Sequence, residues 1–211
     1  ICHYSIYIYI YIFMLIIIDN TKNLKKAYMT PKLLNYLDKI KIKYLVASTR
    51  LEVNRILDEY KKEIKGAILT GGPLCLSEEL TITSINKNIA ILLELKNIPV
   101  LGICFGFQIM AASYGGEIKS MKKEESGIFK INILRETELL NGLSNNFNVY
   151  QSHKDTVIQL PKSFNIIGID DNNKIQIIEN IKEKRWGVQF HPEGLEATNV
   201  IIQNFVNICY I

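Results

Sequence analysis

The stretch PVLGICFGFQIMAA, Pro99 to Ala112, decides the fold of this 211-residue chain. A buried apolar run, PVLGI, ends here, and a segment with helical patterning, FGFQIMAA, begins at once. Cys104 stands at the junction, between Gly102 and Gly106. This G-x-C-x-G pattern is the thiol counterpart of the nucleophile elbow, a sharp strand-to-helix turn whose flanking positions must lack side chains because neighbouring backbone passes close by. The stretch therefore predicts an α/β fold with Cys104 at a strand-to-helix junction.

Cys104 has two interpretations from this turn alone. Free cysteine is among the most buried residue types, so a packing role is one interpretation. The other is a nucleophile, because the turn lifts the sulfur clear of the sheet and sets it at a helix N-terminus, where the helix dipole favours thiolate over thiol. The elbow by itself leaves both open.

Apolar runs alternate with helix-patterned segments through the first half of the chain, which indicates a parallel, doubly wound sheet. Thr30 and Pro31 are predicted as the N-cap and the first residue of the first helix. The expected strands cover residues 14–20, 43–48, 66–72 and 98–103, and the expected helices cover 30–40, 52–64, 84–97 and 105–116.

The second half carries short segments with partial alternation and turn residues between them, which predicts a mixed, partly antiparallel arrangement. We expect one three-layer α/β domain, with a flavodoxin-like mixed sheet whose core strands are mainly parallel and whose C-terminal portion is antiparallel. The expected strands here cover residues 127–134, 147–153, 156–160, 165–171, 174–180 and 185–190, and a final helix covers 196–208.

Charge and cysteine content exclude several classes of function. The net charge of +4 is spread over Lys-rich segments such as KKEIK and MKKEE, in which acidic residues interrupt the basic ones. This pattern is typical of a solvated face and argues against nucleic-acid binding. The four cysteines, at positions 2, 75, 104 and 209, show neither metal-type spacing nor the density of a secreted disulfide scaffold. We therefore expect no metal site and a reducing, cytoplasmic environment.

The N-terminal segment ICHYSIYIYIYIFMLIII is almost wholly apolar and, at roughly 18 residues, close to the length that crosses a bilayer. Its Ile-Tyr repeat is of low complexity, the chain does not begin with Met, and no basic region or small-residue cleavage site accompanies it. We expect residues 1–13 to be a leader upstream of the true start at Met14, residues 14–211 to form the domain, and no membrane association. A genuine membrane anchor or an extra strand is the alternative for residues 1–13.

His191 is the candidate base for Cys104. It ends an expected strand, and Pro192 biases it to an extended conformation. Glu193 lies two residues on, where its carboxylate would accept the imidazole N–H and keep the ring in the tautomer that takes a thiol proton. The alternative is a structural histidine with satisfied hydrogen bonds.

The glycine turn LTGGP, residues 69–73, is the candidate oxyanion site. Its unencumbered backbone N–H groups would act together with the amide of Phe105, which directly follows the cysteine. A plain β–α turn is the alternative.

Four separated blocks, LTGGP, PVLGICFGFQ, SHKDTV and GVQFHPE, occur in the order and at the spacing seen in class I, or triad-type, glutamine amidotransferase domains. The chain resembles this family from Met14 to its C-terminus. The resemblance implies that Cys104 attacks the side-chain amide of L-glutamine, that His191 acts as general base and then general acid, and that Glu193 orients His191.

The resemblance also implies roles for the residues around this triad. Gly72 and the amide of Phe105 would form the oxyanion hole. The SHK segment would hold the α-amino and α-carboxyl end of glutamine, largely through backbone groups, and a glutamine on the first turns of the elbow helix would help. The implied substrate-binding residues are Gln108, Ser152, His153 and Lys154.

The triplet His153, Lys154 and Asp155 makes the glutaminase subunit of two-chain GMP synthetase the most similar branch of the family, since the anthranilate and aminodeoxychorismate synthase subunits usually show Tyr-His-Ser there. His153 and Asp155 are expected either as solvated loop groups or at a partner interface. The chain lacks an S-G-G-x-D-S signature of ATP pyrophosphatases. The resemblance therefore implies no cofactor in this chain, with ATP and Mg bound by a partner synthetase subunit.

Several departures from the family pattern keep other functions open. They are Leu74 and Cys75 after the glycine turn, Phe107 before Gln108, and Gly194 after HPE. A glutaminase subunit of a chorismate-using synthase, a standalone hydrolase of γ-glutamyl compounds, and a catalytically silent regulatory descendant are the alternatives. The intact Cys-His-Glu set argues against the last of these.

Overall fold

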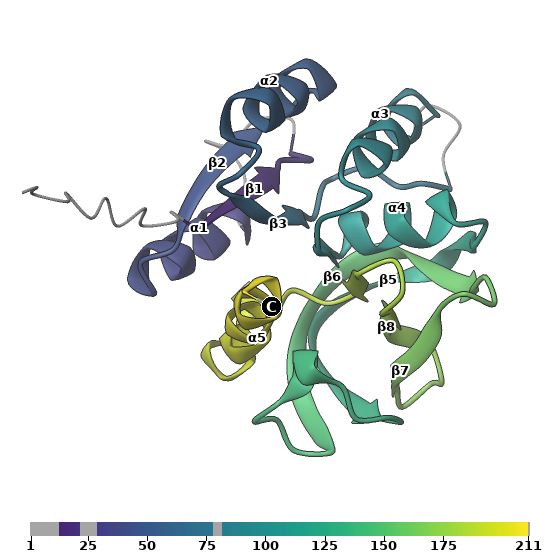
Figure 1. Ribbon diagram of the computed structural model, residues 1–211. Helices are drawn as coiled ribbons and strands as arrows, with labels where there is room; N and C mark the ends of the chain where they lie inside the picture. The colour runs from purple at the N-terminus through teal and green to yellow at the C-terminus, as the bar shows by residue number, and fades with distance from the viewer. Residues whose placement is uncertain (1–12, 22–28, 78–81, 211) are drawn as a thin grey trace, which may run out of the picture.

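A computed structural model describes residues 13–21, 29–77 and 82–210 of the chain. In these ranges one nine-stranded mixed sheet, with strand order β2-β1-β3-β4-β9-β8-β7-β5-β6, has helices on both faces (Figure 1). The predicted three-layer α/β architecture is therefore confirmed. Residues 1–12, which hold most of the expected leader, lie outside the described residues, so the start at Met14 stays a prediction.

Most strands in the parallel half of the sheet are apolar and buried on both faces, as such strands are when helices cover the sheet twice, whereas the edge strand β2 is only partly buried. β1 lies between β2 and β3, β4 follows β3 in the sheet, and β9 follows β4. All of these neighbouring strands pair in parallel. The chain segments that follow β3, β4 and β9 therefore meet at one edge of the sheet. The strands of this half are β1 (Met14–Ile18), β2 (Lys43–Ala47), β3 (Ile64–Leu69), β4 (Val100–Ile103) and β9 (Arg185–Val188).

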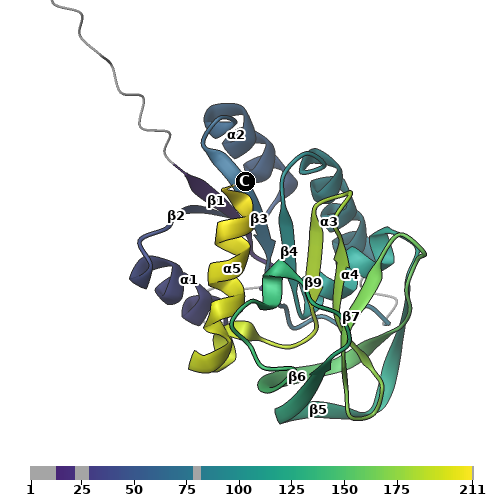
Figure 2. The same cartoon turned by 60° about the horizontal axis from the view of Figure 1, so that its bottom comes forward.

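The antiparallel half extends from β9 through β8 and β7 to a long β5–β6 ribbon, as predicted for the C-terminal portion. Figure 2 shows β5 and β6 running side by side at the end of the sheet. The strands of this half are β5 (Glu117–Ile133), β6 (Asn146–Gln159), β7 (Asn165–Asp170) and β8 (Ile175–Asn180).

The two long strands differ from the prediction. β5 begins ten positions before the expected segment 127–134, and the segments 147–153 and 156–160 belong to the single strand β6. The early part of β5 is charged and mostly exposed, so it carries no apolar alternation from which a strand could be read. A register shift between Ser120 and Glu125 interrupts its pairing with β6 and further obscures the pattern.

Helices cover both faces of the sheet (Figure 2), and each face has its own apolar core. The first face carries α1 and α5, whose apolar side chains share a core with Leu15 and Ile17 of β1. The second face carries α2, α3 and α4, and it packs against Ile16 and Ile18 of the same strand. None of the helices in the described ranges is long and apolar enough to cross a membrane. The helices are α1 (Met29–Lys39), α2 (Arg50–Tyr60), α3 (Ile82–Glu94), α4 (Phe105–Ser113) and α5 (Asn199–Cys209).

The predicted cap of the first helix is wrong. Thr30 is the second residue of α1 and is buried, so it does not precede the helix. Pro31 is nevertheless accommodated, because the first turn of a helix has no intrahelical acceptor for its backbone N–H groups. The capping device of this half is at α2, where Thr49 and Glu52 form a reciprocal capping box.

Candidate active site

Cys104 lies on a strained turn between β4 and α4, as the G-x-C-x-G pattern predicts. Its φ of 52° and ψ of −104° are unusual for a residue with a side chain. A Cβ atom on Gly102 would lie 2.7 Å from the carbonyl oxygen of Gly106, and one on Gly106 would collide with the carbonyl oxygen of Leu69. Only glycine fits at these two positions, so the elbow is confirmed as a backbone structure.

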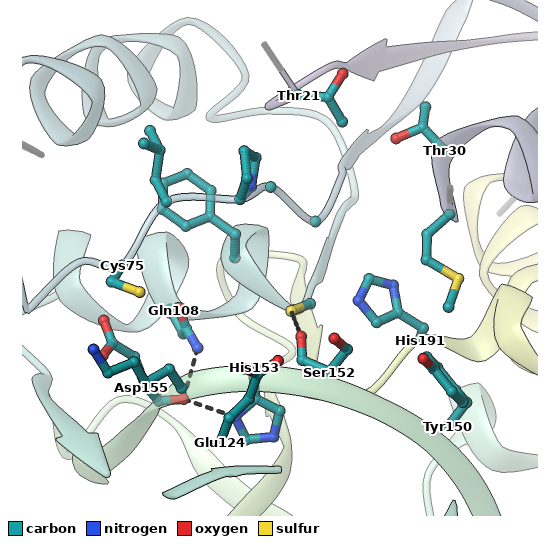
Figure 3. Close-up of a pocket in the computed structure, with 18 residues that line it drawn as sticks. Thr21, Thr30, Cys75, Gln108, Glu124, Tyr150, Ser152, His153, Asp155 and His191 are labelled. Carbon is teal, nitrogen blue, oxygen red and sulfur yellow. Dashed lines mark hydrogen bonds between the residues drawn. The ribbon is translucent and has the colours of Figure 1, made fainter. Parts of the chain in front are cut away.

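The elbow opens into a cavity of about 580 Å³ at the edge of the sheet where β3 and β4 end. The glycine turn after β3, the start of α4, the strand β6 and the segment after β9 together form its wall (Figure 3). The lining residues include Gly71, Gly72, Cys75, Cys104, Phe105, Gln108, Tyr150, Ser152, His153, Lys154, Asp155 and His191. All the predicted site residues except Gly102, Gly106 and Glu193 line this one cavity.

His191 is held by both its backbone and its ring. It is extended, with φ −100° and ψ 97°, and its backbone N–H donates to the carbonyl oxygen of Tyr150 at 2.9 Å. The short 3₁₀ turn Pro192–Gly194 brings Glu193 back against the ring, where Nδ1 lies 2.8 Å from Glu193 Oε1. The predicted contact between these two side chains is therefore present.

The side chains of His191 and Cys104 converge over Gly71. A Cβ atom added to Gly71 would lie 2.7 Å from Cε1 of His191 and 3.5 Å from Cβ of Cys104. Figure 3 shows His191 and Ser152 directed toward the same part of the cavity, with the Cys104 sulfur 3.9 Å from the Ser152 carbonyl oxygen. The first glycine of the turn thus leaves the room in which thiol and imidazole approach each other.

The electrostatics of His191 match a proton carrier. Burial by itself lowers the pKa of His191, but the charges of Glu193 and Cys104, with hydrogen bonds to both, raise it well above its ordinary value of 6.5. His191 is 5% exposed and Glu193 is 6% exposed, so water screens this interaction little. The arrangement favours the protonated imidazole next to the sulfur.

Gly72 and Phe105, whose backbone amides are the predicted oxyanion donors, both line the cavity. Neither amide donates a hydrogen bond to any other group in the described part of the chain. Phe105 is the first residue of α4, so its N–H is one of those that a helix leaves without an internal acceptor. A side chain at position 72 would lie 2.7 Å from the carbonyl oxygen of Asn20, which explains the second glycine of the turn.

The SHK segment is part of β6 and not a loop. His153 is 6% exposed and Asp155 is 2% exposed, so the interpretation of these two residues as solvated loop groups is wrong. The reason is that β6 continues through the whole segment and alternate side chains turn into the protein. His153 Nδ1 donates to the Asp155 carbonyl oxygen at 2.8 Å, and Nε2 faces the Gln151 side chain.

Gln108 points its amide into the protein. Its Nε2 donates to the Asp155 carbonyl oxygen at 2.9 Å and to Gln189 Oε1 at 3.1 Å. The predicted substrate-binding side chain thus ties the elbow helix to β6 and to the segment after β9, and it still lines the cavity.

A buried polar network behind the cavity was not predicted. Gln151 Nε2 donates to Gln176 Oε1 at 3.2 Å. The Glu125 carboxylate lies between His153 and Lys174 and pairs with both of them. These residues come from β5, β6, β8 and the turn before β8. No local motif marks them, because the network exists only once the antiparallel strands pair.

Two departures from the family pattern have local explanations. A Cβ atom on Gly194 would lie 2.7 Å from the Cβ atom of Tyr150, the residue whose carbonyl oxygen holds His191. Phe107 is fully buried, and Gly187 on β9 leaves room for its ring. Both departures therefore fit the packing around the site.

Comparison with known proteins agrees with this geometry. Residues 17–208 match the family model of glutamine amidotransferase class-I. The chain therefore belongs to the class-I glutamine amidotransferase family. Among its relatives, a glutamine-hydrolyzing GMP synthase subunit from Methanocaldococcus jannaschii is 35% identical over 173 residues, 80% of this chain and 88% of that protein. The subunit of the same name from Methanococcus maripaludis is 39% identical over 178 residues, 83% of this chain and 87% of that protein.

Solved structures show the same fold. A crystal structure from Thermoplasma acidophilum superposes with a TM-score of 0.80 and 22% identity over 94% of both chains. A glutamine amidotransferase from Thermotoga maritima superposes with a TM-score of 0.69 and 19% identity, over 93% of this chain and 81% of that one. At these identities the likeness concerns the fold alone.

Proposed function

We propose that this chain is the glutamine-hydrolysing subunit of a two-chain GMP synthetase, which releases ammonia from L-glutamine for the amination of XMP by a partner. The observation that carries the proposal is the meeting of Cys104 and His191 at one cavity that Gly72 and Phe105 also line, with Glu193 hydrogen-bonded to His191 from behind. The relatives that are named as glutamine-hydrolyzing subunits of GMP synthase support the choice of acceptor.

In the proposed first step the Cys104 sulfur forms a bond to the side-chain carbonyl carbon of glutamine. His191 holds the proton that the thiol has given up, which its raised pKa favours. The carbonyl oxygen becomes an oxyanion, and the amides of Gly72 and Phe105 would donate to it. The C–N bond then breaks, His191 gives its proton to the departing nitrogen, and ammonia leaves.

The second step removes the glutamyl group from the enzyme. Water attacks the thioester carbon, His191 takes a proton from it, and the C–S bond breaks to release glutamate and the Cys104 thiolate. Glu193 stays hydrogen-bonded to Nδ1 throughout and keeps Nε2 directed at the reacting atoms. No step requires a metal ion or a cofactor from this chain.

Substrate would lie along β6. Backbone groups of Ser152 and Lys154 would hold the α-amino and α-carboxyl end of glutamine, with His153 fixing the course of the strand between them. Gln108 would support this wall through its hydrogen bond to the Asp155 carbonyl oxygen. ATP and Mg would bind the partner synthetase, in a cytoplasmic complex.

The test is glutamate release from L-glutamine by residues 14–211, alone and with an ATP-pyrophosphatase subunit, XMP and ATP-Mg. We expect weak activity alone and stimulation of about tenfold or more in the full mixture, equal to roughly 1.4 kcal/mol of barrier. Equal activity in both mixtures would contradict the GMP synthetase assignment and favour a standalone hydrolase or a chorismate-using partner. No glutamate release under any condition would contradict the glutaminase assignment itself.

A further inference from the structure

Both carboxylate oxygens of Asp155 accept hydrogen bonds from one residue of a neighbouring loop, Ser77. Its Oδ2 accepts from the backbone N–H of Ser77 at 2.8 Å, and its Oδ1 accepts from the Ser77 hydroxyl at 2.6 Å. Asp155 is 2% exposed, whereas Ser77 lies at the surface. Hydrogen bonds to a buried carboxylate are among the stronger ones in proteins, so this pair is a firm attachment point.

The attached loop, Gly71–Ser77, is the one that carries the Gly72 amide. Its beginning is fixed at the end of β1, because the Asn20 backbone N–H donates to Thr70 Oγ1 at 3.0 Å and Asn20 Nδ2 donates to the Thr70 carbonyl oxygen at 3.1 Å. Its far end is fixed by Asp155. The cavity-lining residues of the loop lie between these two attachment points.

The backbone of Asp155 is itself fixed by the elbow helix. Its carbonyl oxygen accepts from Gln108 Nε2 at 2.9 Å and from His153 Nδ1 at 2.8 Å, and Figure 3 shows these contacts together. Gln108 lies on α4 one turn after Cys104. Asp155 therefore links the helix that positions the sulfur to the loop that positions Gly72.

We propose that Asp155 is a positioning residue, which through Ser77 holds the loop Gly71–Ser77 so that the Gly72 amide meets the oxyanion formed on attack by Cys104. This inference rests on the proposed function. An oxyanion donor acts only if it is placed before the reaction, and a displacement of about 1 Å can cost about a hundredfold in rate. Asp155 touches no reacting atom itself.

The experiment compares Asp155→Asn with the unaltered chain in the full mixture with partner, XMP and ATP-Mg. Because the oxyanion exists in the transition state and not in bound glutamine, we expect kcat to fall by about tenfold to a hundredfold while KM for glutamine changes less than about threefold. Alkylation of Cys104 by iodoacetamide, which forms no oxyanion, should keep its rate. Amide hydrogen exchange in the peptide that contains residues 71–77 should accelerate.

Glu179→Gln is the matched control. Glu179 is also a buried carboxylate that accepts from a hydroxyl, that of Thr137, at 2.6 Å, but it does not line the cavity. We expect it to leave kcat unchanged. Ser77→Ala removes only one of the two hydrogen bonds and should give a smaller loss, and the double variant should lose no more than Asp155→Asn alone, since both act through one link.

Two results would overturn the inference while leaving the proposed function standing. One is that the unaltered chain hydrolyses glutamine and the Asp155→Asn variant hydrolyses it with the same kcat. The other is a loss of Cys104 alkylation in step with kcat, which would show that the substitution disturbs the triad or the fold. An unaltered chain without any glutamine hydrolysis would instead overturn the proposed function, and the role of Asp155 in that reaction with it.

Discussion

Nδ1 of His191 lies 2.8 Å from Oε1 of Glu193, and the other carboxylate oxygen, Oε2, is buried with no hydrogen-bond partner in the described ranges. The short turn Pro192–Gly194 produces this contact, closed by a hydrogen bond from the Gly194 N–H to the His191 carbonyl oxygen at 2.9 Å. A carboxylate with a single partner directs its charge at that partner. Glu193 therefore hydrogen-bonds to the imidazole and to no other group within those ranges.

Replacing Glu193 by Gln tests this relationship. The substitution keeps the shape and removes the charge, which is the largest of the effects that oppose burial and raise the pKa of His191, so that pKa should fall. Departure of ammonia needs protonated His191, so activity declines as the pH rises above the pKa of His191. We expect kcat to fall by about a hundredfold at neutral pH and the alkaline limb of the pH profile to move to lower pH. An unchanged alkaline limb would contradict a role for Glu193 in holding the proton.

Replacing Cys104 by Ala should abolish glutamate release, by about a thousandfold or more, and leave the fold intact. Circular dichroism and thermal unfolding would check the fold. Cys209→Ala is the control, because Cys209 is buried against Gly66 on β3 and does not line the cavity. It should lose some stability and keep its activity. Glutamine hydrolysis by Cys104→Ala would exclude the mechanism.

The burial of His153 should make stability depend on pH. Burial lowers the pKa of His153, against the opposing effects of the Asp155 carbonyl and the Glu125 charge. The unfolded chain then binds a proton more readily than the folded one, so this stability is complete above about pH 6.5 and is lost as the pH falls through the folded pKa. Urea unfolding between pH 7 and pH 5 should show this decline, up to about 1.4 kcal/mol per pH unit.

His153→Gln isolates that contribution, since glutamine does not titrate in this range. The decline below pH 6.5 should be shallower in the variant than in the unaltered chain. His191 does not interfere, because a group with a raised folded pKa contributes its full stability below the unfolded value and loses it only as the pH rises. Identical slopes for the two proteins would mean that His153 takes up no proton on unfolding.

Gly106→Ala reverses the usual rule for helices. Alanine normally stabilises a helix by about 1 kcal/mol relative to glycine, but a Cβ atom here collides with the carbonyl oxygen of Leu69 on β3. We expect a loss of about 2–4 kcal/mol in the free energy of unfolding, with loss of activity as the elbow moves. Ala112→Gly on the same helix is the comparison and should cost about 1 kcal/mol. A neutral Gly106→Ala would show that α4 can shift away from the sheet.

The sequence predicted the parallel half of the sheet closely and the β5–β6 ribbon poorly. Strands β1, β3 and β4 are short apolar runs buried on both faces, and such runs stand out between helical segments. The first part of β5 is charged and exposed, and the edge of a sheet imposes no apolar pattern on such residues. Its pairing with β6 depends on contacts between distant residues, which local patterning does not record.

The sequence by itself determined the elbow. The glycine at position 102 is required by the turn itself, because a Cβ atom there would meet the backbone of Gly106 and Phe107, and the two-residue spacing of His191 and Glu193 is closed by a single turn of backbone. Spacing along the chain carries this information because the interacting groups are neighbours in sequence. The candidates for the nucleophile and for its base could therefore be chosen from local patterns alone.

Only the tertiary structure decided how these pieces work together. It places Cys104 and His191 over Gly71, and it makes Asp155, which was expected either as a solvated loop group or at a partner interface, the buried link between the elbow helix and Ser77. These relationships join residues that are far apart in the chain, and their distances are set by the packing of four strands and a helix. No pattern of neighbouring residues contains that information, because the energy of each contact depends on partners that only folding brings together.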